Sequence, residues 1–282
     1  MMATVNSALP SSRSASAARK RQAGKIGWAV LTTVVVAITF FPIYWMVLST
    51  IQPTKYSTFF PPPLIPRGAN LSVFSTLFSK YPIWSWLWHS TIVALGATAI
   101  CIVLSILGAY AISSFRWRGR AIFAVFLLLT QMLPEALIVV PIFRIFTHFP
   151  VTGWDLRNNY AGLSLLDAAF IVPVTVWILK NLYDTIPNEV REAAYVDGAG
   201  PMRVLVQIMV PLTLPGLVAV GVVAFFYAWN EYLFAQLLTT DNTMYTASVG
   251  LGQMKTMLDT PIEMQLAAGL SIAVPPESFY AV

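Results

Sequence analysis

The sequence predicts an all-α fold, a polytopic membrane bundle of about six transmembrane helices. Of its 282 residues, 57% are hydrophobic and only 10% are charged, and the mean hydropathy is +0.70. Because a soluble domain carries about 25% charged residues, this much apolar surface must face lipid or other helices. The chain also contains several apolar runs of the length that crosses a bilayer, which is about 20 residues.

We expect these runs to form one transmembrane domain over residues 26–282. The expected spans are 26–50, 88–113, 121–145, 162–184, 213–240 and 264–282. The first run is too long for the apolar core of a signal peptide and has no small-residue cleavage site, so we expect it to remain as a span. Residues 1–25 are rich in Ser, Ala and Arg and are expected to form a disordered cytoplasmic tail, with a transit peptide as the alternative.

The basic residues predict the orientation of the spans. Most of them lie in the tail, in the loop at 116–120 and around the loop at 186–211. Since cytoplasmic loops carry an excess of Lys and Arg, we expect both termini in the cytoplasm and a multi-pass protein of the plasma (inner) membrane. The net charge of +5 does not indicate nucleic-acid binding, because the basic residues stand at the ends of apolar runs.

Neither the cysteine nor the histidines indicate chemistry. The single cysteine, Cys101, lies in an apolar run, and no His or Cys cluster stands near it. We therefore expect a buried, inert thiol and no metal site.

Three tryptophans, Trp84, Trp86 and Trp88, follow the proline-rich segment 61–66. Tryptophan gathers where a membrane meets water, because its ring is apolar and its N–H group is polar. We therefore expect an interfacial belt. Stacking against a sugar ring is the alternative that remains open.

The loop at 186–211 carries the most informative local signals. Asn188 suits the N-cap of a short helix. Asp197 and Gly198 are expected to end that helix, because glycine adopts a left-handed conformation at little cost. Pro201 suits the first turn of a second helix. The pattern predicts a helical elbow at the cytoplasmic surface, which by itself has a purely structural explanation.

The same loop resembles the EAA loop of bacterial ABC importer permeases. The matching residues are Glu192, Ala193, Ala194, Gly198, Ile208 and Pro211. The family usually has Leu before this proline, where the chain has Val210. The flanking 197–199 and Trp229-Asn230-Glu231-Tyr232 resemble the carbohydrate branch, in particular the smaller permease of maltose-type importers. Outside these motifs the resemblance, from the first span to the fifth, consists of hydropathy and spacing.

This resemblance implies a type I ABC importer permease fold and a non-catalytic transport subunit. In the family the loop is a coupling helix seated in a cleft of the ATPase subunit. The implied coupling residues are Glu192, Ala193, Ala194, Asp197, Gly198, Ile208 and Pro211. Glu192 would make a polar contact with the ATPase, while the two alanines would permit close packing. Gly198 would aim the helix, and Asp197 would stabilise the elbow.

The resemblance also implies an assembly. Its other parts would be a second homologous permease, an ABC ATPase dimer and an extracytoplasmic substrate-binding protein or lipoprotein, and the solute would be a sugar or oligosaccharide. The chain has no G-x-x-x-x-G-K phosphate loop, so we expect ATP and Mg²⁺ on the ATPase and no cofactor on this chain. In maltose-type relatives the loop equivalent to 241–263 reaches into the binding protein, and its Gly, Thr and Met residues suggest an adaptable loop here. The basic tail usual in the family does not follow Pro275 and Pro276, so tail contacts are not carried over.

Polar residues inside the spans are candidates for a substrate pathway, because burying them in a membrane is costly. The predicted pathway residues are Gln131, Glu135, Tyr227, Asn230 and Glu231. Gln131 and Glu135 are expected on one helical face. Counting 1.5 Å per residue from the inner ends of their spans puts Glu135 and Asn230 at similar depths, about 21 and 25 Å. The alternative is a set of interhelical hydrogen bonds that only hold the bundle together.

The sequence leaves two alternative functions. An ABC permease for a polyamine, phosphate or peptide is the nearest, and Glu135 and Glu231 would suit a cation. A membrane-embedded enzyme such as a lipid-linked glycosyltransferase would need carboxylates or a His cluster at a membrane surface, where this sequence offers only scattered acids. The sequence does not predict which sugar is carried.

Overall fold

The computed structural model describes residues 12–52, 64–66, 68, 70–148, 153, 155–256 and 260–280, with side chains from Arg21 to Pro276 except Ala23. All regular structure in these residues is helical, which confirms the all-α prediction. The chain divides into two units, residues 1–71 and 72–282, which are described separately. The helices are α1 (Ser12–Ile51), α3 (Ser72–Lys80), α4 (Ile83–Ser114), α5 (Arg120–Thr130), α6 (Glu135–Thr147), α7 (Tyr160–Asp184), α8 (Asn188–Val196), α9 (Pro201–Val204), the π-helix η1 (Leu205–Met209), α10 (Val210–Leu212), α11 (Leu214–Asn230), α12 (Leu233–Leu238), the 3₁₀ turn η2 (Asn242–Met244), α13 (Ala247–Thr256) and α14 (Ile262–Tyr280).

The first unit contains one long helix, α1, with Pro42 inside it. The helix begins at Ser12, so it takes in residues 12–25 of the segment that we expected to be a disordered tail. These residues include several Ala, Arg and Lys, which favour a helix. Residues 1–11 of the expected tail lie outside the described residues.

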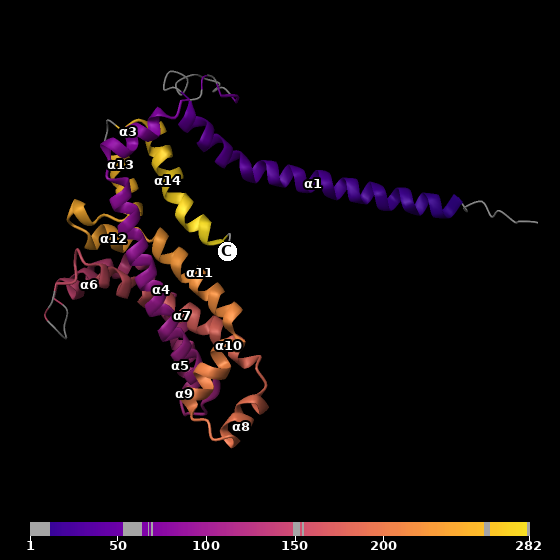
Figure 1. Cartoon of the computed structure of the whole chain (residues 1–282), viewed down its shortest axis with the longest axis vertical. Coiled ribbons are helices and arrows are strands. Elements are labelled where there is room, and N and C mark those ends of the chain that lie inside the picture. Colours follow the sequence, from indigo (N-terminus) through magenta and orange to yellow (C-terminus); the bar gives the residue numbers. More distant parts are fainter. Residues whose placement is uncertain are drawn as a thin grey trace, which may run out of the picture. The chain divides into compact units, whose positions relative to one another are not determined.

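The core of the second unit is formed by α4, α7 and α11, which run side by side (Figure 1). Small residues allow α4 and α7 to approach closely. A Cβ atom on Gly96 would lie 2.5 Å from Oγ of Ser164, and one on Gly108 would lie 3.1 Å from a methyl carbon of Val176. This use of glycine is typical of packed membrane helices. The buried Cys101 thiol lies 3.1 Å from Oγ1 of Thr175, at the same interface.

Three helical segments in the described residues are long and apolar enough to cross a membrane, namely Gly24–Ile51 of α1, α4 and α7. Two bent pairs, α5 with α6 and Pro201–Leu212 with α11, raise this number to as many as five. The sixth expected span corresponds to α14, which is not among them. Its apolar run is interrupted by Glu263, Gln265 and the pair Pro275-Pro276.

The third expected span is not one helix. Helices α5 and α6 meet at an angle of 98°. The break precedes Pro134, which lacks a backbone N–H group and disfavours a helical conformation for Leu133. The prediction that Gln131 and Glu135 share one helical face is therefore wrong, and so is the depth counted for Glu135 along a continuous helix.

The segment expected as a fifth span over 213–240 is also divided. Helix α11 ends at Asn230, Glu231 is extended (φ −62°, ψ 128°), and the short α12 begins at Leu233. Much of the loop at 241–263 is helical, since it contains η2 and α13. Figure 1 places α3 and α13 at the end of this unit opposite α8 and α9, with α12 between the two ends.

Candidate coupling elbow and intramembrane polar cluster

The elbow begins with α8, directly after Pro187. Pro187 is the N-cap residue, with extended geometry (φ −55°, ψ 139°), and Asn188 is the first helical residue. The side chain of Asn188 accepts a hydrogen bond from Nη2 of Arg191 and caps no backbone N–H group. The N-cap prediction for Asn188 is therefore wrong, because the extended ψ of Pro187 makes that residue the cap and the helix begins one residue earlier than expected.

The end of α8 agrees with the sequence. Asp197 is the C-cap residue, and Gly198 has φ +78°. The N–H groups of Gly198 and Ala199 donate to the carbonyls of Tyr195 (3.1 Å) and Ala194 (2.9 Å). No atom lies within 4 Å of the position of a Cβ on Gly198, so the backbone conformation, and not the space, requires glycine there. Pro201 is the first residue of α9, as predicted.

Polar contacts anchor the elbow to the end of α4. The hydroxyl of Tyr110 donates to the carbonyl of Pro201 at 3.0 Å and lies 3.2 Å from the hydroxyl of Tyr195. Nη1 of Arg191 donates to Oγ of Ser114 at 2.9 Å. These bonds hold both halves of the elbow against the bundle.

The coupling residues named from the sequence divide into two groups. Ala194 is buried in a core cluster with Tyr110 and Tyr183, so it packs within this chain. Glu192 and Ala193 are exposed. The inward side of α8 is thus already occupied, and its outward side presents a carboxylate next to a small residue.

The elbow is joined to α11 through irregular helix. The π-helix η1 follows α9 and contains Ile208, which packs half-buried against the same core cluster. The chain then bends by 82° between Leu212 and Leu214. Pro211 and Pro215 flank this bend, and proline is the usual cause of a sharp kink. A displacement of α8 would therefore reach α11 through a short, continuous connection.

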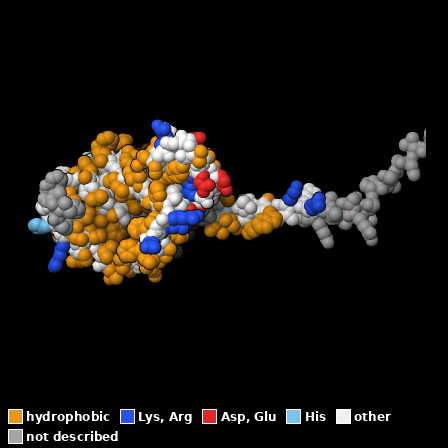
Figure 2. Space-filling view, turned by 90° about the horizontal axis from the view of Figure 1, so that it is seen from below, with side chains coloured by type: hydrophobic (Ala, Val, Ile, Leu, Met, Phe, Trp, Pro, Cys, Tyr) orange, Lys and Arg blue, Asp and Glu red, His pale blue; other side chains and the backbone are white. Residues whose placement is uncertain are grey.

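A charged cleft of about 740 Å³ lies between α8 and the ends of α4 and α7. Figure 2, which views the molecule from this end, shows acidic and basic side chains gathered there amid hydrophobic ones. The charged residues that line the cleft are Arg116, Arg120, Asp184, Glu189, Arg191 and Glu192. Such a mixed charge pattern suits a protein partner better than a single small ion.

The polar cluster lies at the break between α5 and α6. The hydroxyl of Tyr227 in α11 donates to Oε1 of Glu135 at 2.8 Å. Glu135 is the first residue of α6, where the helix dipole favours a carboxylate. Two residues chosen separately from the sequence are thus in direct contact.

Glu231 has a local structural task. Its two carboxylate oxygens accept from the N–H groups of Phe234 and Ala235, at 2.8 Å each, and so cap the start of α12. Gln131 and Asn230 are exposed, and their amides donate to the carbonyls of Phe170 and Phe226, both at 2.8 Å. Neither amide is hydrogen-bonded to Tyr227 or Glu135.

Asp167 belongs to the cluster but was missed. Its residue is only 2% exposed within α7, and its Oδ1 atom has no hydrogen-bond partner. The carboxyl groups of Glu135 and Glu231 lie in its neighbourhood. The signal was visible, since Asp167 interrupts the apolar run of the fourth expected span. In the described residues no group of three or more His, Cys, Asp or Glu is placed to hold a metal ion.

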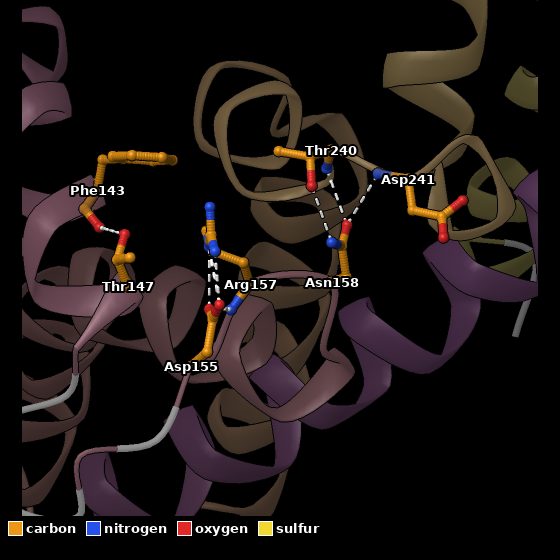
Figure 3. Close-up of polar contacts among 7 residues, drawn as sticks. All are labelled: Phe143, Thr147, Asp155, Arg157, Asn158, Thr240 and Asp241. Carbon is orange, nitrogen blue, oxygen red and sulfur yellow. Dashed lines mark hydrogen bonds and ion pairs between the residues drawn. The ribbon is translucent and has the colours of Figure 1, made fainter.

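The loop before α7 is tied to the end of α12, as Figure 3 shows. Asn158 has φ +47°, and its Oδ1 accepts from the N–H groups of Thr240 (2.8 Å) and Asp241 (3.0 Å). Nearby, Nη2 of Arg157 lies 2.6 Å from Oδ2 of Asp155. Hydrogen bonds from Arg157 lower the pKa of Asp155 to about 2, so this exposed pair stays ionised at neutral pH.

Broken helices and polar groups inside a bundle of apolar helices are features of multi-spanning transport proteins. Residues 102–275 match the family described as the inner membrane component of binding-protein-dependent transport systems, and the chain belongs to that family. It is therefore a multi-pass transport permease, a class without catalytic function. The resemblance found from the EAA loop is confirmed.

The chain is similar to relatives over much of its length. It is 30% identical to an inner membrane ABC transporter permease of Escherichia coli (strain K12), in an alignment that covers 94% of this chain and 94% of the relative. It is 31% identical to a trehalose/maltose transport system permease of Thermococcus litoralis, in an alignment that covers 76% of this chain and 75% of the relative. A solved bacterial ABC transporter involved in the import of the acidic polysaccharide alginate matches 93% of this chain and 96% of its own, with a TM-score of 0.76 and 20% identity. The shared fold confirms the predicted type I ABC importer permease fold.

Proposed function

We propose that this chain forms, with a second permease, the pathway by which an ATP-driven importer moves a sugar or oligosaccharide into the cell. The observation that carries the proposal is the elbow, whose sequence resembles the EAA loop and in which Gly198 (φ +78°) makes the turn after α8. The trehalose/maltose permease among the relatives and the motif at 229–232 support a carbohydrate.

The proposed contact with an ATPase subunit is made by the outward side of α8. Glu192 and Ala193 are exposed and adjacent, so they are the residues that touch the partner. Ala194 and Ile208 instead pack the elbow onto the bundle, while Asp197 and Gly198 end α8. Pro211 lies at the bend that leads into α11. Movement of the ATPase would pass along this path to the membrane helices.

The rest of the assembly follows from this role. ATP and Mg²⁺ bind the ATPase dimer, and a substrate-binding protein or lipoprotein docks at the opposite end. The family description, with its dependence on a binding protein, supports the last of these partners. In this arrangement α8 and the N-terminus lie in the cytoplasm, as the positions of the basic residues favour.

The proposed pathway includes Glu135, Tyr227 and Glu231, and we propose Asp167 as a further member because it is buried near both glutamates. The exposed Gln131 and Asn230 remain candidates for the surface that meets the second permease. The carboxyl groups of Glu135, Asp167 and Glu231 are buried or half-buried and would attract a cationic solute. They therefore favour, as the alternative function, the import of a polyamine.

Uptake by the assembled transporter tests the function. The chain is reconstituted in proteoliposomes with its second permease, its ATPase and its binding protein. Radiolabelled maltose, trehalose and spermidine are then compared with ATP present and absent. We expect ATP-dependent uptake of a sugar. Uptake of spermidine alone would establish the polyamine alternative, and uptake without ATP would contradict the importer.

A further inference from the structure

A cavity of about 390 Å³ lies at the end of the bundle opposite the elbow, between the start of α4 and the segment at 242–254. Its size falls within the range of about 300–1,000 Å³ that is usual for small-molecule sites. The residues that line it include Tyr81, Ser85, Trp86, Asn242, Tyr245 and Gln253. None of the described residues that line it is charged.

The lining combines aromatic rings with uncharged hydrogen-bonding groups. Tyr81 and Tyr245 are half-buried, so parts of their side chains remain accessible, whereas Asn242 is exposed. A sugar ring presents C–H groups on its faces and hydroxyls around its edge. It is therefore recognised by a ring face together with amide and hydroxyl groups, which is the set found here.

Trp86 provides the observation that points to a ligand. Its residue is 5% exposed, and its Nε1–H group is buried without a hydrogen-bond partner. A buried donor of this kind is rare, because a polar group removed from water without a hydrogen-bond partner is strongly unfavourable. A hydroxyl in the cavity that Trp86 lines would accept this bond.

The walls of the cavity are held in place by contacts behind them. His89 is buried, with Nε2 3.2 Å from Oγ of Ser85 and Nδ1 3.0 Å from the carbonyl of Tyr245. A Cβ atom on Gly250 would lie 2.2 Å from the indole of Trp86, so the ring is packed directly on the backbone of α13. Two segments distant in sequence are thereby fixed facing one another before any ligand arrives.

We propose that this cavity is a subsite for one ring of an uncharged sugar, at the outer mouth of the transporter. The inference rests on the proposed function, which supplies both the carbohydrate and the orientation. Trp86 donates from Nε1 to a sugar hydroxyl, Tyr81 or Tyr245 covers a ring face, and Asn242 binds the rim. The subsite would hold sugar released by the binding protein before it enters the bundle.

The test uses the assembled transporter without its binding protein, with maltose and trehalose as probes. Saturation-transfer NMR measures whether magnetisation passes from the protein to each disaccharide, and titration gives the Kd. Trp86→Phe keeps the ring but removes the N–H donor. Trp84→Phe is the matched control, because Trp84 is 72% exposed and does not line the cavity. Asn242→Ala, at an exposed position, tests the subsite without a risk to folding.

We expect Trp86→Phe and Asn242→Ala each to raise the Kd about three- to tenfold, as loss of one hydrogen bond does, with no change for Trp84→Phe. Unchanged Kd values for both variants would overturn the subsite. The subsite would also be overturned if no magnetisation passes to a disaccharide that the same transporter takes up once the binding protein is added. That last result would leave the proposed function standing, whereas failure to take up any sugar would remove both.

Discussion

The hydroxyl of Tyr227 donates to Oε1 of Glu135 at 2.8 Å, and this bond ties α11 to the first turn of α6. Helix α6 departs from α5 at 98°, so it has lost the support of a continuous helix. The bond therefore fixes one side of the break against the central bundle.

Tyr227→Phe removes this bond and leaves the carboxyl of Glu135 without its donor. Hydrogen bonds to charged groups contribute about 1.5–3 kcal/mol, and we expect a loss of stability of that order. Thermal unfolding of the purified chain measures it. Tyr232→Phe is the control, because Tyr232 is 44% exposed and loses only an accessible hydroxyl. Equal unfolding midpoints for the two variants would contradict the role assigned to the bond.

Gly198→Val should disconnect the permease from its ATPase. A residue with a Cβ costs about 1–2 kcal/mol in the left-handed conformation that Gly198 adopts (φ +78°). We expect the end of α8 to shift, so that less ATPase copurifies and sugar uptake falls. Gly200→Ala is a matched control, because Gly200 has φ −75° and an equally open surrounding. Wild-type copurification and uptake by Gly198→Val would count against the coupling role of the elbow.

Topology is tested by cysteine labelling in intact cells. Arg118→Cys and Asn188→Cys should resist an impermeant thiol reagent, since both positions belong to segments expected in the cytoplasm. Asn242→Cys should react, because this exposed residue lines a cavity with Tyr81 and Pro82, at the start of α4, whereas the elbow contacts the end of α4. The native Cys101 is buried and should give no background. Labelling of Asn188→Cys from outside would reverse the proposed orientation.

Asp167→Asn should stabilise the protein. The change preserves the shape of the side chain but removes a carboxyl that is 2% exposed, lacks a partner at Oδ1 and lies near Glu135 and Glu231. The neutral amide avoids both the cost of burying a charge and the repulsion between neighbouring carboxylates, so we expect a higher unfolding midpoint. Thermal unfolding is compared with that of Asp155→Asn, which alters an exposed, paired carboxyl. A destabilised Asp167→Asn would mean that the carboxyl itself is needed in the bundle.

Asn158 should hold the loop before α7 to the end of α12. Asn158→Gly removes its bonds to Thr240 and Asp241 but tolerates φ +47°, whereas Asn158→Ala also adds backbone strain. Hydrogen exchange at residues 239–241 should therefore increase from wild type to Asn158→Gly and again to Asn158→Ala. Similar exchange in all three proteins would show that other contacts hold this junction.

The fold class and the main features of the elbow could be predicted from the amino-acid sequence. A shortage of charged residues and long apolar runs admit only buried or lipid-facing helices, whatever their arrangement. The turn after α8 was also predictable, because the conformations available to Gly198 and Pro201 are set by local covalent structure. The capping of α8 was predicted less well, since Pro187 and Asn188 compete for one position and their neighbours decide between them.

Where the spans break and which polar groups meet depend on how the whole bundle packs. Pro134 weakens a helix locally, but the 98° turn between α5 and α6 depends on the helices against which they pack. The contact between Tyr227 and Glu135, the burial of Asp167 and the cavity beside Trp86 each join segments far apart in the chain. Such contacts leave no periodic signal in the sequence, because they depend on distances that are set when the whole bundle packs.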